Sequence, residues 1–99
     1  LDRLHRLPAL AALDQQLGEG RKAMKAIERV WPASPHPDLA QLYLAAAGEK
    51  DHLKRVQALK RLTANNPDDL DSHIAMAREC LEARLWGEAR RHLAAAGAV

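Results

Sequence analysis

The segment Asn66–Ala96, NPDDLDSHIAMARECLEARLWGEARRHLAAA, decides the fold class of this chain. After the Asn-Pro break, apolar residues recur at helical spacing and form a wide arc over Leu70–Leu81. A second, narrower apolar stripe begins at Trp86. A helix with a wide arc must be covered on two sides, whereas a narrow stripe needs only one neighbour. The segment therefore predicts an antiparallel helical hairpin over 69–96 with a tight turn near Arg84-Leu85.

The rest of the chain is divided in the same way by residues that interrupt helices. The pieces between these breaks are about 10–15 residues long, which is the usual length of a helix. We therefore expect six helices in three hairpins, at about 3–31, 37–65 and 69–96, within a single domain over 1–99 that is a fragment of a longer protein. The breaks are Gly18-Glu19-Gly20, Pro32–Pro37, Gly48–Asp51 and Asn65–Asp69.

Four residues mark where helices begin and end. Asp51 and Asp69 are expected N-caps, because a short side chain can accept hydrogen bonds from the free amides of a first turn. Pro37 suits the first turn of a helix, and Gly97 is placed to end the last helix in a left-handed conformation.

Composition narrows the fold and function classes. Hydrophobic residues make up 47% of the 99 residues, but aromatics only 3%, and alanine supplies much of the difference. Alanine is the best helix former, and runs of Val, Ile and Thr typical of strands are missing. The net charge of +2, with acidic and basic residues interleaved, indicates no nucleic-acid partner. The single cysteine, Cys80, excludes a disulfide within the chain.

The final hairpin resembles the tetratricopeptide repeat. Ala77, Ala89, Leu93 and Ala96 match the signature positions of that family, and Trp86 takes a large aromatic position. His73 and Cys80 depart from the pattern, since the family usually has Trp and Tyr there. The match weakens over Leu4–Pro35 and is degenerate over Asp38–Pro67. The resemblance implies a right-handed stack of helical hairpins that binds other proteins.

A more particular resemblance covers most of the chain. The segments PHPDLAQLY (Pro35–Tyr43), LKRVQALKRLTANNPDDLDSHIAMA (Leu53–Ala77) and LWGEARRHL (Leu85–Leu93) look like the C-terminal region of bacterial HemY-type proteins. That family has a membrane-anchored N-terminal part and is associated with haem biosynthesis. The resemblance implies the soluble part of an inner-membrane protein, with the anchor outside this chain and the side of the membrane undetermined.

No residue pattern points to catalysis, a metal or a cofactor. Gly18-Glu19-Gly20 follows no strand and is read as a turn, not a phosphate loop. No two of the five histidines have the i, i+3 or i+4 spacing of a helix-borne metal site. His73 and Cys80 share a helix face and are interpreted as a packed core pair. The two tryptophans and Tyr43 are expected to fill gaps between helices.

We therefore predict a non-enzymatic scaffold that binds a protein or peptide in a groove lined by the first helix of each hairpin. The lysine and asparagine set with which some tetratricopeptide domains hold a peptide carboxylate is missing. Two alternatives stay open, a haem- or porphyrin-binding module and a structural spacer in a longer stack. Exposed apolar edges on the outer hairpins would favour a homodimer. The expected groove residues are Gln41, Leu44, Asp71, Ile74, Arg78 and Glu82.

Overall fold

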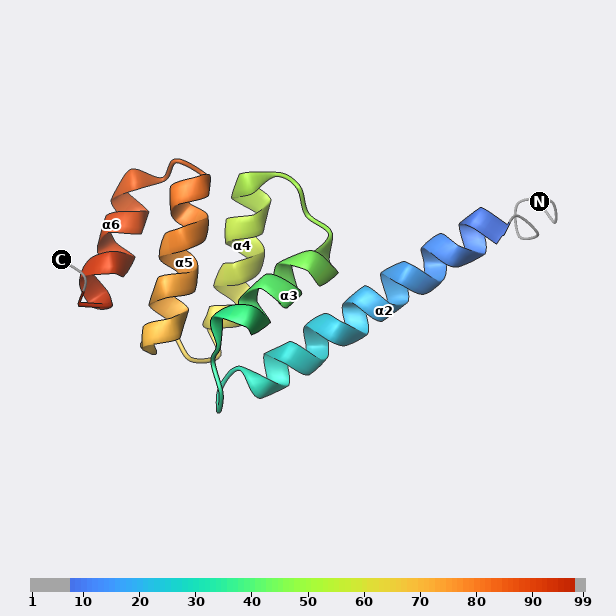
Figure 1. Ribbon diagram of the computed structural model, residues 1–99, viewed down its shortest axis with the longest axis horizontal. Coiled ribbons are helices and arrows are strands. Elements are labelled where there is room, and N and C mark those ends of the chain that lie inside the picture. Colours follow the sequence, from blue (N-terminus) through green and yellow to red (C-terminus); the bar gives the residue numbers. More distant parts are fainter. Residues whose placement is uncertain (1–7, 98–99) are drawn as a thin grey trace.

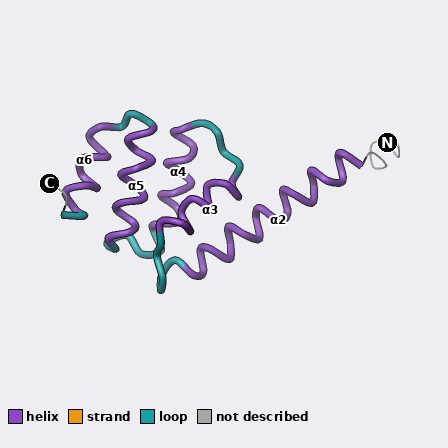
Figure 2. Tube along the Cα trace, in the orientation of Figure 1, coloured by secondary structure: helices purple, strands orange, loops and turns teal. Residues whose placement is uncertain are grey.

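The computed structural model describes the backbone of residues 8–97 and the side chains of residues 17–97, and all regular structure in that part is α-helical (Figures 1 and 2). The all-α class is therefore confirmed for the described residues. None of the helices in them is both long and apolar enough to cross a membrane. The first residues of the hairpin expected at 3–31 lie outside the described range. The helices are α2 (Pro8–Val30), α3 (Pro37–Ala47), α4 (His52–Thr63), α5 (Leu70–Glu82) and α6 (Trp86–Ala95).

The break predicted at Gly18-Glu19-Gly20 is wrong, because α2 runs through it as one continuous helix of 23 residues. The described part of the segment 3–31 is thus a single helix and not a hairpin. Gly20 lies where α2 passes the end of α3, and a Cβ there would stand 2.6 Å from the carbonyl oxygen of Ala46. Gly20 thus allows the backbones of α2 and α3 to approach closely. Close backbone approach is a common role of glycine, as is the tight turn that was predicted here.

The other helix starts follow the predicted caps. The Asp51 carboxylate accepts a hydrogen bond from the Lys54 amide at 3.0 Å, and Asp69 accepts one from the Asp71 amide at 2.8 Å. Pro37 is the first residue of α3, as expected. These contacts satisfy amides that have no partner inside the helix.

The turn predicted near Arg84-Leu85 is confirmed and has a defined geometry. The Leu85 amide donates to the carbonyl of Cys80 at 2.8 Å, and the Arg84 amide donates to that of Leu81 at 3.0 Å. This pair of bonds is a Schellman motif, which requires a left-handed residue after the helix. Arg84 supplies it with a φ of 59°, and Gly97 does so after α6 with a φ of 79°.

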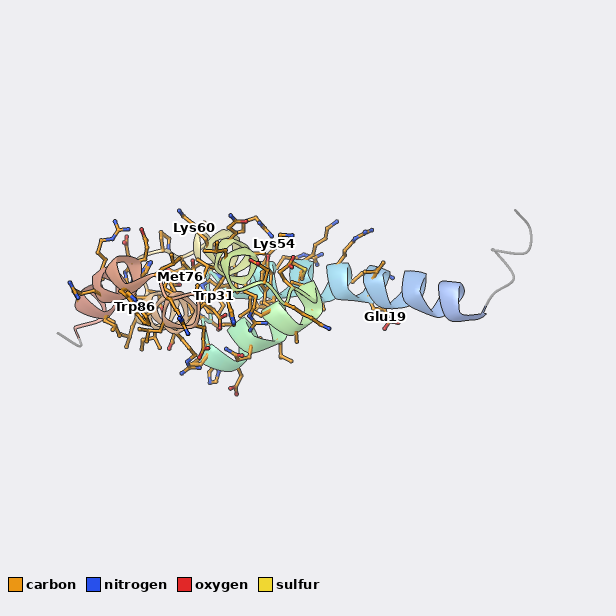
Figure 3. The ribbon with its side chains drawn as sticks, turned by 90° about the horizontal axis from the view of Figure 1, so that it is seen from above. Glu19, Trp31, Lys54, Lys60, Met76 and Trp86 are labelled. Carbon is orange, nitrogen blue, oxygen red and sulfur yellow. The ribbon has the colours of Figure 1, made fainter. Side chains whose placement is uncertain are left out.

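The helices form two connected groups. In Figure 1, α4, α5 and α6 lie side by side, while α2 and α3 run antiparallel to each other and α2 projects well beyond α3. Trp31 and Met76 lie among the helices in Figure 3, and Trp31 donates from its indole nitrogen to Ser72 Oγ at 2.9 Å. This bond ties the end of α2 to the start of α5. The largest fully buried apolar side chains are Trp31, Tyr43, Leu44, Leu59, Leu62 and Cys80.

Trp86 does not fill a gap between helices, in contrast to the prediction for the two tryptophans and Tyr43. It is 57% exposed and lies at the outer end of the row of helices (Figure 3). The narrow stripe of α6 is instead buried at Ala89. A small residue there lets α6 approach α5 closely, and Trp86, at the first position of the helix, then lies beyond the contact.

Candidate functional site

The structure brings together three of the six expected groove residues. Gln41 on α3 and both Arg78 and Glu82 on α5 line one open hollow of about 300 Å³. Arg78 and Glu82 are four residues apart, so they lie on the same face of α5. We call this site the polar hollow, and its lining is Gln41, His52, Arg55, Arg78, Glu79 and Glu82.

The other three expected groove residues lie elsewhere. Leu44 is only 1% exposed and belongs to the core, so its assignment to a groove is wrong. It faces inward because Ala40, Tyr43 and Leu44 form the buried side of α3. Asp71 and Ile74 are partly buried and do not line the polar hollow. Asp71 precedes Arg78 by seven residues, or about 10 Å along the helix.

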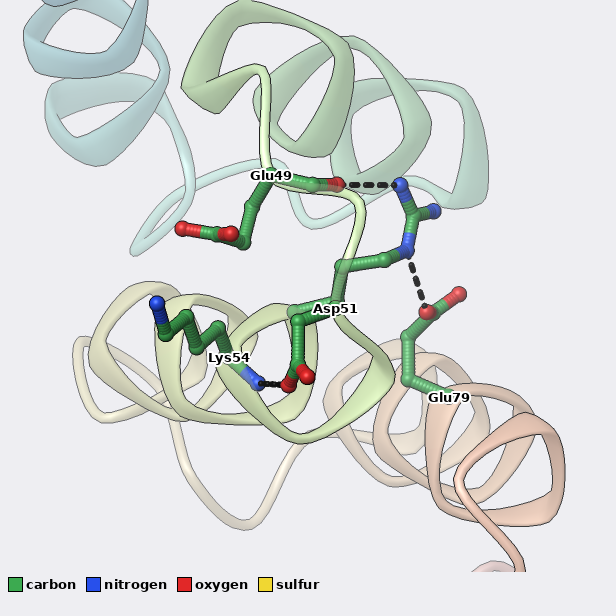
Figure 4. Close-up of polar contacts among 5 residues, drawn as sticks. Glu49, Asp51, Lys54 and Glu79 are labelled. Atoms are coloured by element: carbon green, nitrogen blue, oxygen red, sulfur yellow. Dashed lines mark hydrogen bonds and ion pairs between the residues drawn. The ribbon is translucent and has the colours of Figure 1, made fainter.

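An interhelical ion pair forms part of the polar hollow. Arg55 Nε on α4 donates to Glu79 Oε1 on α5 at 3.0 Å, and its Nη1 donates to the Glu49 carbonyl at 3.2 Å (Figure 4). Glu79 is 4% exposed, so its charge depends on this partner. Removing one member of a buried pair leaves a charge without compensation, which is strongly destabilising. Arg55 and Glu79 therefore hold α4 against α5. Because the two charges compensate each other, neither is available to bind a partner.

Arg78 and Glu82 differ from that pair in having solvent-exposed side chains. Among the described residues, neither of them forms an ion pair. The polar hollow thus offers one free cation and one free carboxylate from α5, beside an amide on α3. Such a surface can contact a segment that carries both an acidic and a basic side chain. The sequence indicated Arg78 and Glu82, but the Arg55–Glu79 pair depends on helix packing that no local pattern reveals.

A second hollow of about 470 Å³ lies between α4, α5 and α6 and was not predicted. Leu53, Val56, Met76 and Leu85 supply apolar lining, and Glu88 and His92 of α6 also border it. We call it the apolar hollow. Its residues come from three helices with no shared sequence motif, so periodicity alone could not bring them together.

Of the expected core pair His73 and Cys80, only Cys80 belongs to the buried core. Cys80 is fully buried, and burial raises the pKa of its thiol. His73 is only partly buried, and its Nδ1 lies 3.0 Å from Nδ1 of His92 on α6. Burial lowers the pKa of His92, and the neighbouring His73 lowers it further. The two histidines are 19 residues apart, which is why spacing within one helix could not reveal them.

No group of three or more His, Cys, Asp or Glu side chains among the described residues is arranged to hold a metal ion. A full protein-built cage of the kind found in structural zinc sites is therefore not present in that part of the chain. Two groups of described residues thus remain as candidates for binding. They are Arg78 and Glu82 in the polar hollow, and the pair His73 and His92 beside the apolar hollow.

Comparison with known proteins gives one informative similarity. No protein-family model matches the chain, and no solved structure matches it. The chain is similar to a protein of Magnetospirillum gryphiswaldense (strain DSM 6361 / JCM 21280 / NBRC 15271 / MSR-1) described as "Probable magnetosome protein Mms48". The two are 33% identical over 94 residues, which cover 90% of this chain and 20% of that protein. The chain therefore spans about a fifth of the length of the relative that it matches.

Proposed function

We propose that this chain is a non-catalytic protein-interaction module with tetratricopeptide-like packing. The α5–α6 hairpin supports the packing, because Ala77 and Ala89 are 2% and 1% exposed where the repeat needs small residues. The Schellman turn at Arg84 fixes the antiparallel return of the chain. The neighbouring helices α3 and α4 extend the stack on the side of α5 that α6 leaves free.

The observation that carries the binding proposal is the pair of exposed charges in the polar hollow. Arg78 and Glu82 project from α5 into a hollow that is also bordered by Gln41 of α3. The first helices of successive hairpins, here α3 and α5, line the surface with which helical stacks bind partners. The start of α4 also contributes His52 and Arg55 to the hollow. The partner segment that fits carries an acidic side chain for Arg78 and a basic one for Glu82.

The resemblance to HemY-type proteins suggests the kind of protein to which this module belongs. On that resemblance, we extend the proposal to a module of a longer bacterial membrane protein that is associated with haem biosynthesis. The relative in Magnetospirillum gryphiswaldense is itself about five times the length of the matched region.

A capture experiment on solubilised membranes tests the binding surface. The fragment and an Arg78→Glu variant are immobilised, and the proteins they retain from the source organism are identified by mass spectrometry. Arg29→Glu is the matched control, because it makes the same charge change at an exposed position of α2, outside the polar hollow. Circular dichroism first establishes that all three proteins have the same helical content.

We expect the fragment and Arg29→Glu to retain the same set of proteins and Arg78→Glu to lose it. Restoring binding with a partner peptide of reversed charge would assign the contact to Arg78 directly. If Arg78→Glu retains the same set, the polar hollow is not the binding surface. If none of the proteins binds a specific partner, a structural spacer within a longer stack becomes the better reading.

A further inference from the structure

The histidine pair between α5 and α6 has a geometry with a chemical use of its own. The two Nδ1 atoms lie 3.0 Å apart, and the ring centroids are 5.3 Å apart with the planes tilted by 42°. Both nitrogens therefore point at one small region between the helices. A neutral imidazole presents a lone pair on one ring nitrogen and a proton on the other, so one ring donates to its neighbour in the metal-free pair.

The region can be reached from solvent. His92 borders the apolar hollow, and Glu88, one helical turn earlier on α6, borders it as well. Both histidines are partly and not fully buried. A small hydrated ion can therefore approach His92 from the side of the hollow, and the Nδ1 atom of His73 lies 3.0 Å from that of His92.

The surrounding charges oppose each other. Glu88 favours a cation beside His92, whereas Arg91 on α6 and Lys60 on α4 oppose one. Arg91 donates a hydrogen bond to the carboxylate of Glu88, which offsets part of its charge.

We propose that His73 and His92 form a two-histidine binding site for a borderline divalent transition-metal ion such as Zn²⁺, with each ring binding through Nδ1 and water completing the coordination. Zinc–nitrogen bonds of about 2.0–2.1 Å in a tetrahedral arrangement set neighbouring ligands about 3.3 Å apart. The observed spacing of 3.0 Å needs to open by only a few tenths of an ångström. In the metal-free pair the accepting ring already carries its proton on Nε2, so binding requires only the donating ring to move its proton from Nδ1 to Nε2. Imidazole is a good ligand for Zn²⁺, Cu²⁺ and Ni²⁺.

Two protein ligands define what kind of site this is. The described residues contain no cluster of three ligands, so the ion is held more weakly than a structural zinc in a four-ligand cage. The helices and their turn form without the metal, since the buried core of α5 and α6 does not involve the histidines. The site therefore binds its ion reversibly and clamps α6 to α5 when it is occupied.

Thermal unfolding with and without ZnCl₂ provides the first test, using His73→Ala and His92→Ala. His52→Ala is the matched control, because His52 is exposed on α4 and borders the polar hollow instead. A ligand that binds only the folded state raises the melting temperature, and we expect a rise of about 7 °C at tenfold excess over the dissociation constant. The rise should persist in His52→Ala and disappear in each of the other two variants.

The variant Lys60→Gln tests the site by an expected gain of zinc affinity, whereas the alanine variants test it by a loss. Removing this cation from the border of the apolar hollow should tighten zinc binding by several fold, because it eliminates a repulsion at short range. Arg29→Gln, at a distant exposed position on α2, should leave the affinity unchanged. An equal change in both variants would show that net charge, and not the site, controls the binding.

A measurement on the unaltered protein avoids dependence on the folding of any alanine variant. Titration of ¹⁵N-labelled protein with ZnCl₂, followed through the imidazole nitrogens, should shift the Nδ1 resonances of two of the five histidines together. Assignment to His73 and His92 supports the site. Shifts confined to other histidines, a melting temperature that falls with zinc, or a rise retained in either His73→Ala or His92→Ala overturns it.

Discussion

At the scale of single residues, the hydroxyl group of Tyr43 shows how burial and one contact set a chemical property. Tyr43 is fully buried, and its hydroxyl donates to Glu28 Oε2 at 2.6 Å. Burial raises the pKa of Tyr43 to about 12, and both the hydrogen bond to Glu28 and its negative charge act in the same direction. The contact joins the last turn of α2 to the middle of α3.

Tyr43 is the only tyrosine, so its ionisation can be followed directly by ultraviolet absorbance. We expect a midpoint near pH 12 in the folded protein and near pH 10 in urea. Because the folded-state pKa is raised, this group's stabilising effect is complete below pH 10 and is lost as the pH rises towards 12. Glu28→Gln should lower the folded-state midpoint. A midpoint near 10 in the folded protein would contradict the contact.

The predicted positions of single side chains were right where they depended on one helix and wrong where they depended on packing between helices. Helical periodicity alone puts Arg78 and Glu82 on one exposed face of α5, and their role in binding a partner stays a prediction. Leu44 was placed wrongly because Leu42 and Leu44 look alike in sequence, and only the packing of α3 shows that Leu42 is exposed and Leu44 buried. The Arg55–Glu79 and His73–His92 contacts join different helices, so no spacing rule within a helix could have found them.

At the scale of helices and turns, local chemistry fixed most boundaries. Asp51, Asp69, Pro37 and Gly97 all act as expected, since each acts through its own backbone and the next few residues. The helix break predicted at Gly18-Glu19-Gly20 was wrong because a glycine within a helical pattern can have either of two structural roles. It can end a helix, or it can allow another backbone to come close, and only the position of α3 decides between them.

The two glycines of α2 provide a matched pair for testing this explanation. A Cβ at Gly20 would meet the backbone of Ala46, whereas nothing lies within 4 Å of one at Gly18. We expect Gly18→Ala to stabilise the protein by about 0.5–1 kcal/mol through helix propensity. Gly20→Ala should instead destabilise it by about 1–3 kcal/mol through overpacking. Urea unfolding measures both, and the same sign for both substitutions would refute the close approach as the reason for Gly20.

At the scale of the whole molecule, the shape follows from unequal helix lengths. The radius of gyration is 16.1 Å with extents of 58 × 29 × 16 Å, whereas a compact chain of this size has about 13 Å. The excess comes from α2, whose 23 residues exceed the 11 of the α3 helix beside it (Figure 1). The all-helical class followed from composition and periodicity, but this extended shape did not, since it depends on the continuity of α2. Tetratricopeptide-like stacking and self-association stay predictions.

The histidine pair makes the stability of the whole fold depend on pH. Burial lowers the pKa of His92 below its ordinary value of 6.5, and His73 lowers it further. The unfolded chain therefore binds more protons than the folded one as the pH falls through 6.5, and each added proton favours unfolding. Stability from this source is complete above pH 6.5 and declines below it. We expect a lower melting temperature at pH 5.5 than at pH 7.5, measured in a metal chelator.

Carboxylates and the other histidines also titrate towards acid pH, so the prediction concerns a difference between variants. His92→Gln removes the group whose pKa is lowered, and its melting temperature should fall less than that of the unaltered protein between pH 7.5 and 5.5. His52→Gln is the control, because His52 is exposed at the first position of α4, away from the pair. It should retain the full pH dependence. If His92→Gln and the unaltered protein lose stability equally, the contact between the α5 and α6 histidines does not govern the acid sensitivity of the fold.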